Sequence, residues 1–232
     1  MILFTGGSGL LGRELRKLYA AFYAPPKSEF DICDRPAVAT LSRERFECIV
    51  HCAAYTDVAK AESEKELCYQ TNVLGTRNLA DTGIPMIYIS TEYVFGGEKG
   101  NYGEGDCPDP KNFYALTKLL GEGEACRTTH LIIRTCFKPR PFEHAAACVD
   151  QYTSGDYVDV IAKEIFLAIR NFRDLIDETI HIGTGRKSVF DLARQTREVI
   201  PISVETIGVK LPRDTSLDTR KWEEFKSMRK GL

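Results

Sequence analysis

The chain has 232 residues, of which 43% are hydrophobic and 28% are charged, and its formal net charge at pH 7 is -2. A chain of this length and composition can bury the core of one compact domain. The nearly balanced charge disfavours a nucleic-acid-binding protein, and no apolar run approaches the roughly 20 residues that span a membrane.

The eight cysteines are scattered and form no C-x-x-C motif, so their spacing predicts neither a zinc site nor another metal site. The four histidines are also scattered, and those at strand positions are expected to be structural. The apolar start runs directly into glycines rather than into a signal peptide. We therefore expect free thiols and a cytoplasmic protein.

The first predicted element is a buried strand, because the apolar run Ile2–Thr5 stops at glycines. A helix over 10–22 follows, with apolar side chains at helical spacing on one face. Strands and helices then alternate, which predicts a parallel sheet with helices on both faces. The next elements are a short helix over 36–45, a strand over 48–52, a long helix over 60–80 that weakens near Gly75, a strand over 86–89, a surface loop over 96–110, a helix over 113–126 and a strand over 131–133.

Beyond Thr135 the pattern is looser. Helices are expected over 158–169, 189–199 and 219–228, with a short strand over 180–182.

A glycine-rich turn, Thr5 to Gly12, joins the first strand to the first helix. It contains G-x-G-x-x-G in the context that a dinucleotide site requires, because glycines let the backbone approach a pyrophosphate at a helix N-terminus. Glu29 and Asp31 are candidates to hold the ribose of NAD, whereas Lys27 could meet the 2′-phosphate of NADP. A glycine turn that binds nothing and a solvated Lys27 are the alternatives.

Tyr114 and Lys118 lie four residues apart in a helical stretch, so their side chains share one face. A nearby ammonium lowers the pKa of a tyrosine, which predicts Tyr114 as a general acid. Thr91, at the carboxyl end of a strand, can donate a hydrogen bond to the same substrate oxygen. An ordinary surface tyrosine and lysine would explain the pair alone, but not together with the glycine turn and Thr91 in this order.

With these features the chain resembles the extended short-chain dehydrogenase/reductases, most closely their dTDP-4-dehydrorhamnose reductase branch. The resemblance spans nearly the whole chain and implies a doubly wound α/β (Rossmann) fold. The matching segments are Thr5 to Gly12, Phe30 to Asp34, His51 to Thr56 with Lys60 to Glu62, Asn72 to Leu79, Ser90 to Phe95, Tyr114 to Glu122, Asp150 to Tyr152, and Pro212 to Lys221.

The resemblance also implies the site residues. Thr91, Tyr114 and Lys118 would be the catalytic triad, with Tyr114 and Lys118 also contacting the cofactor. Substrate contacts would be Thr91, Glu92, Tyr93 and Arg213. The forked guanidinium of Arg213 suits a diphosphate. The remaining cofactor-binding residues would be Gly6, Ser8, Gly9, Leu10, Leu11, Gly12, Asp31, Ile32, Cys52, Ala53, Ala54 and Thr56.

The implied activity is NAD(P)H-dependent reduction of the 4-keto group of a nucleotide-linked 6-deoxyhexose. NADP is the expected cofactor, and NAD stays open. Related nucleotide-sugar dehydratases carry an Asp-Glu pair after the catalytic threonine. Here Glu92 and Tyr93 occupy those places, so water elimination is disfavoured.

The chain departs from the family after Thr135, because only residues 136–149 precede Asp150, where the family has a longer stretch. We therefore predict a Rossmann core over 1–135 and a shortened substrate-binding lobe over 136–232, interleaved with the core.

Two alternatives to the reductase function stay open. One is another nucleotide-sugar enzyme, such as an epimerase; the other is a non-catalytic dinucleotide-binding subunit resembling the regulatory subunit of methionine adenosyltransferase. A nucleotide sugar is the expected partner, neither nucleic acid nor membrane is expected, and a homodimer is kept open.

Overall fold

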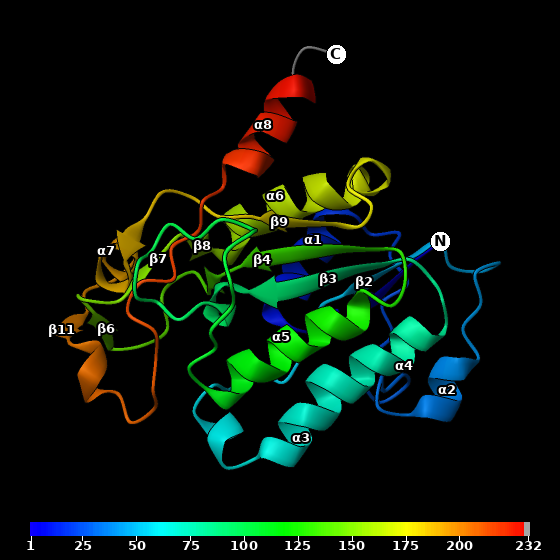
Figure 1. Cartoon of the computed structure of the whole chain (residues 1–232), viewed down its shortest axis with the longest axis horizontal. Coiled ribbons are helices and arrows are strands. Elements are labelled where there is room, and N and C mark those ends of the chain that lie inside the picture. The colour runs from blue at the N-terminus through cyan, green and yellow to red at the C-terminus, as the bar shows by residue number, and fades with distance from the viewer. Residues whose placement is uncertain (230–232) are drawn as a thin grey trace.

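A five-stranded parallel sheet forms the centre of the molecule (Figure 1). The structure, a computed structural model, describes residues 1–229. No helix in that range is long and apolar enough to cross a membrane. The strands, in their order across the sheet, are β1 (Ile2–Thr5), β2 (Cys48–His51), β3 (Met86–Thr91), β4 (His130–Thr135) and β9 (Glu178–His181).

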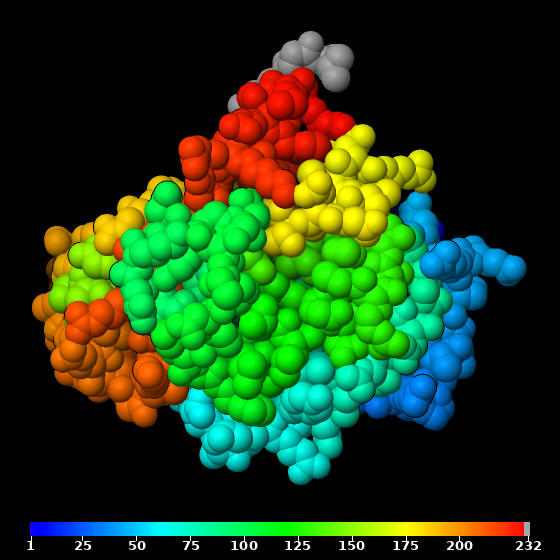
Figure 2. Space-filling model, viewed as in Figure 1, coloured from blue at the N-terminus to red at the C-terminus, as the bar shows by residue number. Residues whose placement is uncertain are grey.

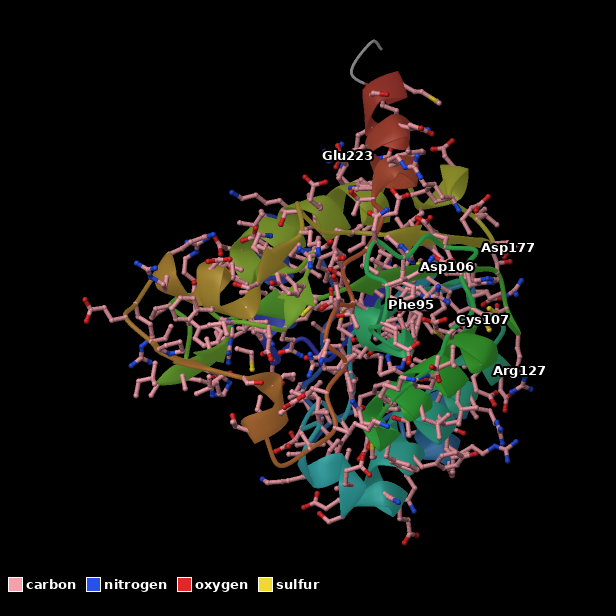
Figure 3. All side chains as sticks on the ribbon, turned by 60° about the vertical axis from the view of Figure 1, so that its left-hand side comes forward. Phe95, Asp106, Cys107, Arg127, Asp177 and Glu223 are labelled. Atoms are coloured by element: carbon pink, nitrogen blue, oxygen red, sulfur yellow. The ribbon has the colours of Figure 1, made fainter. Side chains whose placement is uncertain are left out.

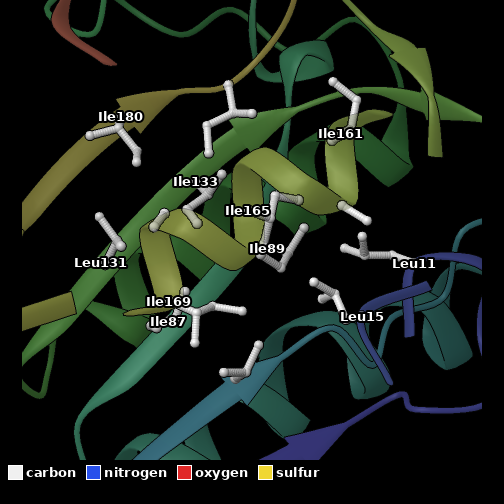
Figure 4. Close-up of a cluster of buried hydrophobic side chains, with 14 of the residues drawn as sticks. Leu11, Leu15, Ile87, Ile89, Leu131, Ile133, Ile161, Ile165, Ile169 and Ile180 are labelled. Atoms are coloured by element: carbon white, nitrogen blue, oxygen red, sulfur yellow. The ribbon is translucent and has the colours of Figure 1, made fainter. Parts of the chain in front are cut away.

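Helices cover both faces of the sheet, which confirms the predicted doubly wound α/β fold (Figure 1). Successive strand residues point to opposite faces, so Phe4 and Ile87 belong to one buried cluster while Leu3 and Tyr88 belong to the other. Figure 4 shows the first cluster, in which α6 and α1 meet β3 and β4. The first face is covered by α1 (Leu10–Leu18) and α6 (Val158–Arg170), and the second by α4 (Gly75–Asp81) and α5 (Phe113–Ala125).

The chain returns to β1 before it crosses to β2. Tyr23 N–H donates to Ile2 O at 3.0 Å, and Phe4 N–H donates to Tyr23 O at 2.8 Å. A short helix, α2 (Arg35–Ala39), then leads to the face covered by α4. The chain therefore pairs first with one edge of β1, at Tyr23, and then with the other, through β2, so the strand order reverses at β1. Open α/β sheets bind ligands at the carboxyl ends of their strands at such a point.

This return explains why the first helix is shorter than predicted. α1 stops at Leu18 instead of residue 22, and Tyr19 is already extended. The chain needs residues 19–22 to reach its pairing with β1. The short helix predicted over 36–45 likewise ends at Ala39.

The prediction of one long helix over 60–80 is wrong. The Asn72 side chain accepts from Tyr55 N–H at 2.8 Å and donates to Tyr55 O at 3.1 Å and to Thr117 Oγ1 at 3.0 Å. These bonds to distant residues hold Asn72 inward and coincide with a widened helical turn. The segment consists of a 3-10 turn (Lys60–Glu62), α3 (Lys65–Tyr69), a π-helical turn (Gln70–Leu74) and α4.

Residues 136–229 contribute the strand β9 to the central sheet and the helix α6 to one of its faces, and they add short strand pairs beside it. The predicted lobe runs to residue 232, and residues 230–232 lie outside the described part; the domain division itself stays a prediction. The helix predicted over 189–199 ends early, at Arg194. The strand pairs are β5 (Phe137–Lys138) with β8 (Asp156–Tyr157), β6 (Ala146–Cys148) with β11 (Ile200–Ile202), and β7 (Tyr152–Thr153) with β10 (Lys187–Ser188); α7 (Val189–Arg194) and α8 (Arg220–Arg229) complete the region.

The predicted loop over 96–110 contains no helix and packs against the rest of the chain through aromatic side chains. Phe95 is fully buried and stacks on Tyr102 with 4.4 Å between the ring centroids. Figure 2 shows the segment on the surface of the molecule, and in Figure 3 Phe95 lies toward the middle while Cys107 lies toward the edge. The loop is therefore anchored at its base.

Candidate active site and cofactor cavity

A cavity of about 500 Å³ lies at the carboxyl ends of β1 and β2. It brings together all the candidate cofactor residues outside the triad. Tyr114 and Lys118 are not among its lining residues. Those that line it are Gly6, Ser8, Gly9, Leu10, Leu11, Gly12, Asp31, Ile32, Cys52, Ala53, Ala54 and Thr56.

The glycine turn leaves room for a diphosphate because side chains are excluded from it. Gly6 has a φ of +75°, and a Cβ there would lie 2.5 Å from Ala53 N. A Cβ on Gly12 would clash with Gly6 O. The N-cap residue of α1 is Gly9, which has no side chain to cap the helix, so the first N–H groups of α1 are available to an anion. These residues therefore fit the diphosphate of a dinucleotide.

The two candidate groups for the adenosine ribose stand side by side. Lys27 Nζ lies 3.5 Å from Asp31 Oδ2, and both residues line the cavity. Asp31 Oδ1 also accepts from Cys33 N–H at 2.9 Å. Glu29, the other carboxylate considered, is not among the lining residues.

α5 is clamped at both ends of the segment that carries the triad residues. At its N-terminus Asn112 Oδ1 accepts from Ala115 N–H at 2.9 Å. Farther along, the buried Glu122 carboxylate accepts from Ser90 Oγ at 2.5 Å and from Arg134 Nε at 3.0 Å and Nη2 at 2.8 Å. The Asn112 bond caps the helix, and the Glu122 bonds tie α5 to β3 and β4, so Tyr114 and Lys118 are held at a fixed distance from the sheet.

Lys118 is buried behind the wall of the cavity. Its Nζ donates to Ile89 O at 2.7 Å and lies 4.0 Å from the centroid of the Tyr88 ring. Burial lowers the pKa of Lys118 to about 8. The lysine is therefore still mostly protonated at neutral pH.

The expected lowering of the Tyr114 pKa is wrong for this structure. Burial raises the pKa of Tyr114 well above its ordinary value, and Cys136 adds to the rise. The Thr91 hydroxyl offsets part of the rise. The ammonium of Lys118 is engaged with Ile89 O and the Tyr88 ring, so desolvation dominates. Tyr114 is therefore a protonated phenol at neutral pH.

Thr91 is the last residue of β3, and Glu92 follows it directly. Thr91 Oγ1 accepts from Tyr93 N–H at 3.2 Å. Glu92 is only 1% exposed, and its Oε1 accepts from Thr153 Oγ1 at 2.6 Å and Thr215 Oγ1 at 2.9 Å. Burial raises the pKa of Glu92 to about 7. This carboxyl thus lies at the contact between the core and the C-terminal region.

Arg213 lines a second cavity, of about 570 Å³, rather than the one at the glycine turn. It pairs with Glu205. The Gln151 amide connects the second cavity to the residues that follow Thr91, because its Nε2 donates to Pro212 O, on the wall of that cavity, at 3.3 Å and to Tyr93 Oη at 3.1 Å. Other cations that line the second cavity are Lys111, Arg186 and Lys210.

His51, at the end of β2, has the structural role that the sequence predicted. Its Nδ1 lies 2.7 Å from Thr5 Oγ1 and its Nε2 lies 3.0 Å from Thr76 Oγ1. Burial lowers its pKa to about 3, so the ring is neutral.

Sequence reasoning missed one wall of the first cavity. Phe137 and Lys138, on β5, line it together with Thr71 from the π-helical turn. The position of Phe137 and Lys138 just beyond β4 was the available signal for a place on the cavity wall, because the carboxyl ends of parallel strands meet at one edge of the sheet. Only the pairing of β5 with β8, distant in sequence, fixes their direction.

Comparisons with known proteins give consistent results. The family model described as RmlD substrate binding domain matches residues 1–138. The dTDP-4-dehydrorhamnose reductase of Mycolicibacterium smegmatis is 31% identical over 235 residues, which cover 89% of this chain and 71% of that protein. A crystal structure of dTDP-4-dehydrorhamnose reductase from Bacillus anthracis in complex with NADP has a TM-score of 0.84 at 28% identity, covering 97% of this chain and 92% of that chain. Methionine adenosyltransferase 2 subunit beta of Xenopus laevis is 35% identical over 136 residues, 52% of this chain and 41% of that protein.

Proposed function

The chain belongs to the RmlD substrate binding domain family, and from this membership we propose that it is an NADPH-dependent reductase of the 4-keto group of a nucleotide-linked 6-deoxyhexose. The single observation that carries the proposal is the position of α5. It holds Tyr114 and Lys118 next to the carboxyl end of β3, where Thr91 lies, beside a cavity whose glycine turn fits a diphosphate. The solved relative with NADP bound supports NADP as the cofactor.

In the proposed reaction Tyr114 is the proton donor. When bound, the reduced nicotinamide supplies the hydride that the keto carbon accepts. The raised pKa of Tyr114 keeps its proton in place at neutral pH until the substrate oxygen becomes an alkoxide, which is a much stronger base than a phenolate. Thr91 would donate a hydrogen bond to the same oxygen, and Lys118, whose Nζ is held by Ile89 O, would be the residue that holds the nicotinamide ribose.

The second cavity is proposed to receive the nucleotide end of the substrate. Arg213 and the other cations lining it suit a diphosphate. Gln151 reaches from this cavity to Tyr93 and so connects it to the reaction centre. Only one carboxylate, that of the buried Glu92, follows Thr91 directly. The missing second carboxylate supports reduction over dehydration.

A second candidate is a non-catalytic dinucleotide-binding subunit. The similarity to methionine adenosyltransferase 2 subunit beta favours it, although that match covers about half of the chain.

A homodimer and a cytoplasmic location also remain proposals. Light scattering of the full chain would test the homodimer.

The deciding experiment measures oxidation of NADPH in the presence of a dTDP- or UDP-linked 4-keto-6-deoxyhexose. We expect turnover with a high KM, because a short substrate lobe removes remote contacts first. Tyr114→Phe is expected to lower kcat by about 100-fold or more while NADPH affinity stays within a few fold. A Tyr114→Phe variant at half the wild-type rate would remove Tyr114 from the mechanism. Tight NADPH binding without turnover of any such sugar, together with a copurifying protein partner, would establish the subunit alternative.

A further inference from the structure

Lys138 is a half-buried lysine on the wall of the cofactor cavity. It lies on β5, just beyond β4, and the pairing of β5 with β8 sets Lys138 opposite Tyr157. Lys138 is two residues beyond Cys136, so on an extended strand the two side chains share one side. The strand thus fixes the direction in which the ammonium points.

The ammonium of Lys138 has no partner. Within residues 1–229, no hydrogen bond joins its Nζ to another residue and no carboxylate oxygen lies within the 4.0 Å of an ion pair. The two other lysines beside this cavity differ: Lys27 on its wall pairs with Asp31, and Lys118 behind the wall donates to Ile89 O. The cavity leaves this ammonium open to solvent, so an arriving anion can replace water there and form a charge-assisted hydrogen bond.

The neighbouring acidic groups do not neutralise this charge at neutral pH. Cys136 contributes most to raising the pKa of Lys138, and burial opposes it; Tyr93, Glu92 and Glu143 contribute less. Burial raises the pKa of Cys136 and of Tyr93 to about 12, so at pH 7 both are neutral. Glu92, with a pKa of about 7, is half ionised at that pH. Glu143 also lines the cavity, but its carboxylate lies beyond ion-pair distance of Lys138. The ammonium of Lys138 therefore has acidic neighbours but no direct counter-ion.

We propose that Lys138 contacts an oxyanion of the bound complex and is a further catalytic residue of the site. The sheet order indicates which oxyanion. β4 leads directly to Lys138 and lies next to β3, which ends at Thr91. The glycine turn follows β1, three strands away, or roughly 14 Å at the usual strand spacing. The substrate oxygen that becomes an alkoxide is thus the expected ligand, and a phosphate of the cofactor is the other source of the same chemistry.

The substrate part of this inference rests on the proposed reductase function, so the test has two arms. The first measures the Kd of NADPH by nicotinamide fluorescence for the wild type, Lys138→Met and Lys138→Arg. The second measures kcat and KM with a 4-keto nucleotide sugar. Lys17→Met is the control, because Lys17 is exposed, pairs with Glu14 and is not among the lining residues of the cavity. Thermal unfolding verifies that each variant folds, and Lys138→Gln replaces Lys138→Met if the latter does not.

For a substrate oxyanion, Lys138→Met should lower kcat by about 10-fold or more with the Kd of NADPH within about 3-fold, and Lys138→Arg should recover most of the rate. For a cofactor phosphate, Lys138→Met should instead weaken NADPH by about 10-fold, again with recovery by arginine. Unchanged NADPH affinity and unchanged kcat would overturn the inference. If the wild type binds NADPH but reduces no keto sugar, the reductase proposal fails by itself; the first arm then decides alone, and an unchanged Kd overturns the role of Lys138.

Discussion

Residues 1–135 and residues 136–229 organise their structure in different ways. The first part places strands of four to six residues side by side, each buried on both faces. Apart from β9, which joins the central sheet, the second part pairs strands of two or three residues with partners far away in the sequence, such as β6 with β11. Its interior depends on single side-chain bonds, for example from Tyr157 Oη to Leu192 O at 2.8 Å. The first part is thus specified by local pattern and the second by contacts that only the folded chain provides.

The candidate site takes its components from both parts. The cofactor cavity is built mainly by the first part, whereas the substrate side lies where the parts meet. Glu92 follows β3 but is held by Thr153 and Thr215. Substitutions confined to one part should therefore show separate effects on stability, on cofactor binding and on substrate turnover.

The largest effect is expected from the anchor of α8 in the second part. Trp222 is fully buried, and its Nε1 donates to Glu164 Oε2 of α6 at 2.7 Å. Trp222→Ala should lower the free energy of unfolding by about 3–5 kcal/mol in urea titrations. Met228→Ala, on the same helix and 72% exposed, is the control and should change it by less than about 0.5 kcal/mol. Equal effects of the two variants would mean that α8 is not anchored through Trp222.

Two glycines of α5 test how closely the first part is packed. A Cβ on Gly121 would clash with Tyr88 Oη and lie 2.7 Å from Asn72 O, whereas a Cβ on Gly123 meets nothing within 4 Å. Gly121→Ala should therefore destabilise the protein by about 1–3 kcal/mol. Gly123→Ala should be neutral or stabilising by up to about 1 kcal/mol, because alanine favours helix. Thermal unfolding in parallel measures both, and the same shift for both would contradict a close contact of α5 with the sheet.

The pH dependence of stability tests the contact between the two parts at Glu92. Burial raises the Glu92 pKa from 4.5 to about 7, so the folded protein retains a proton that the unfolded chain releases. Stability should fall as the pH rises from 4.5 through about 7, and the loss is complete above that pH. Glu92→Gln should remove this component, raising Tm relative to the wild type at about pH 8 more than at about pH 5. Parallel pH profiles for the two proteins would show that the carboxyl is ionised without cost.

The smallest effect is expected at the adenosine end of the cavity. Lys27 is 72% exposed and 3.5 Å from Asp31 Oδ2, so it can turn toward a 2′-phosphate. Lys27→Ala should weaken NADPH by about 3–10-fold and leave NADH unchanged, as titrations of both cofactors would show. Lys17→Ala is the matched loss of charge. Tighter binding of NADH than of NADPH by the wild type would reverse the expected preference.

The sequence predicted those parts whose causes are local. β1, β2 and β3 were predictable because continuous apolar runs end at glycine, cysteine–alanine or serine–threonine segments. The glycine turn located the part of the cavity wall from Gly6 to Gly12, whereas Ile32 and Cys52 to Thr56 were implied only by the family resemblance. The break in the helix predicted over 60–80 was not predictable from the sequence, because it accompanies bonds from Asn72 to Tyr55 and Thr117, which are far away in the sequence. Lys138 was missed for the same physical reason, since only the β5–β8 pairing directs it into the cavity.

The π-helical turn Gln70–Leu74 also limits how this segment can change in length during evolution. A regular helix turns about 100° per residue, so losing one residue there would rotate α4 by that angle relative to α3. The rotation would carry Thr76 away from His51, 3.0 Å from it now, and Leu79 away from the sheet. Relatives one residue shorter in this segment should therefore lack the threonine–histidine contact, even where every residue of the cavity is unchanged.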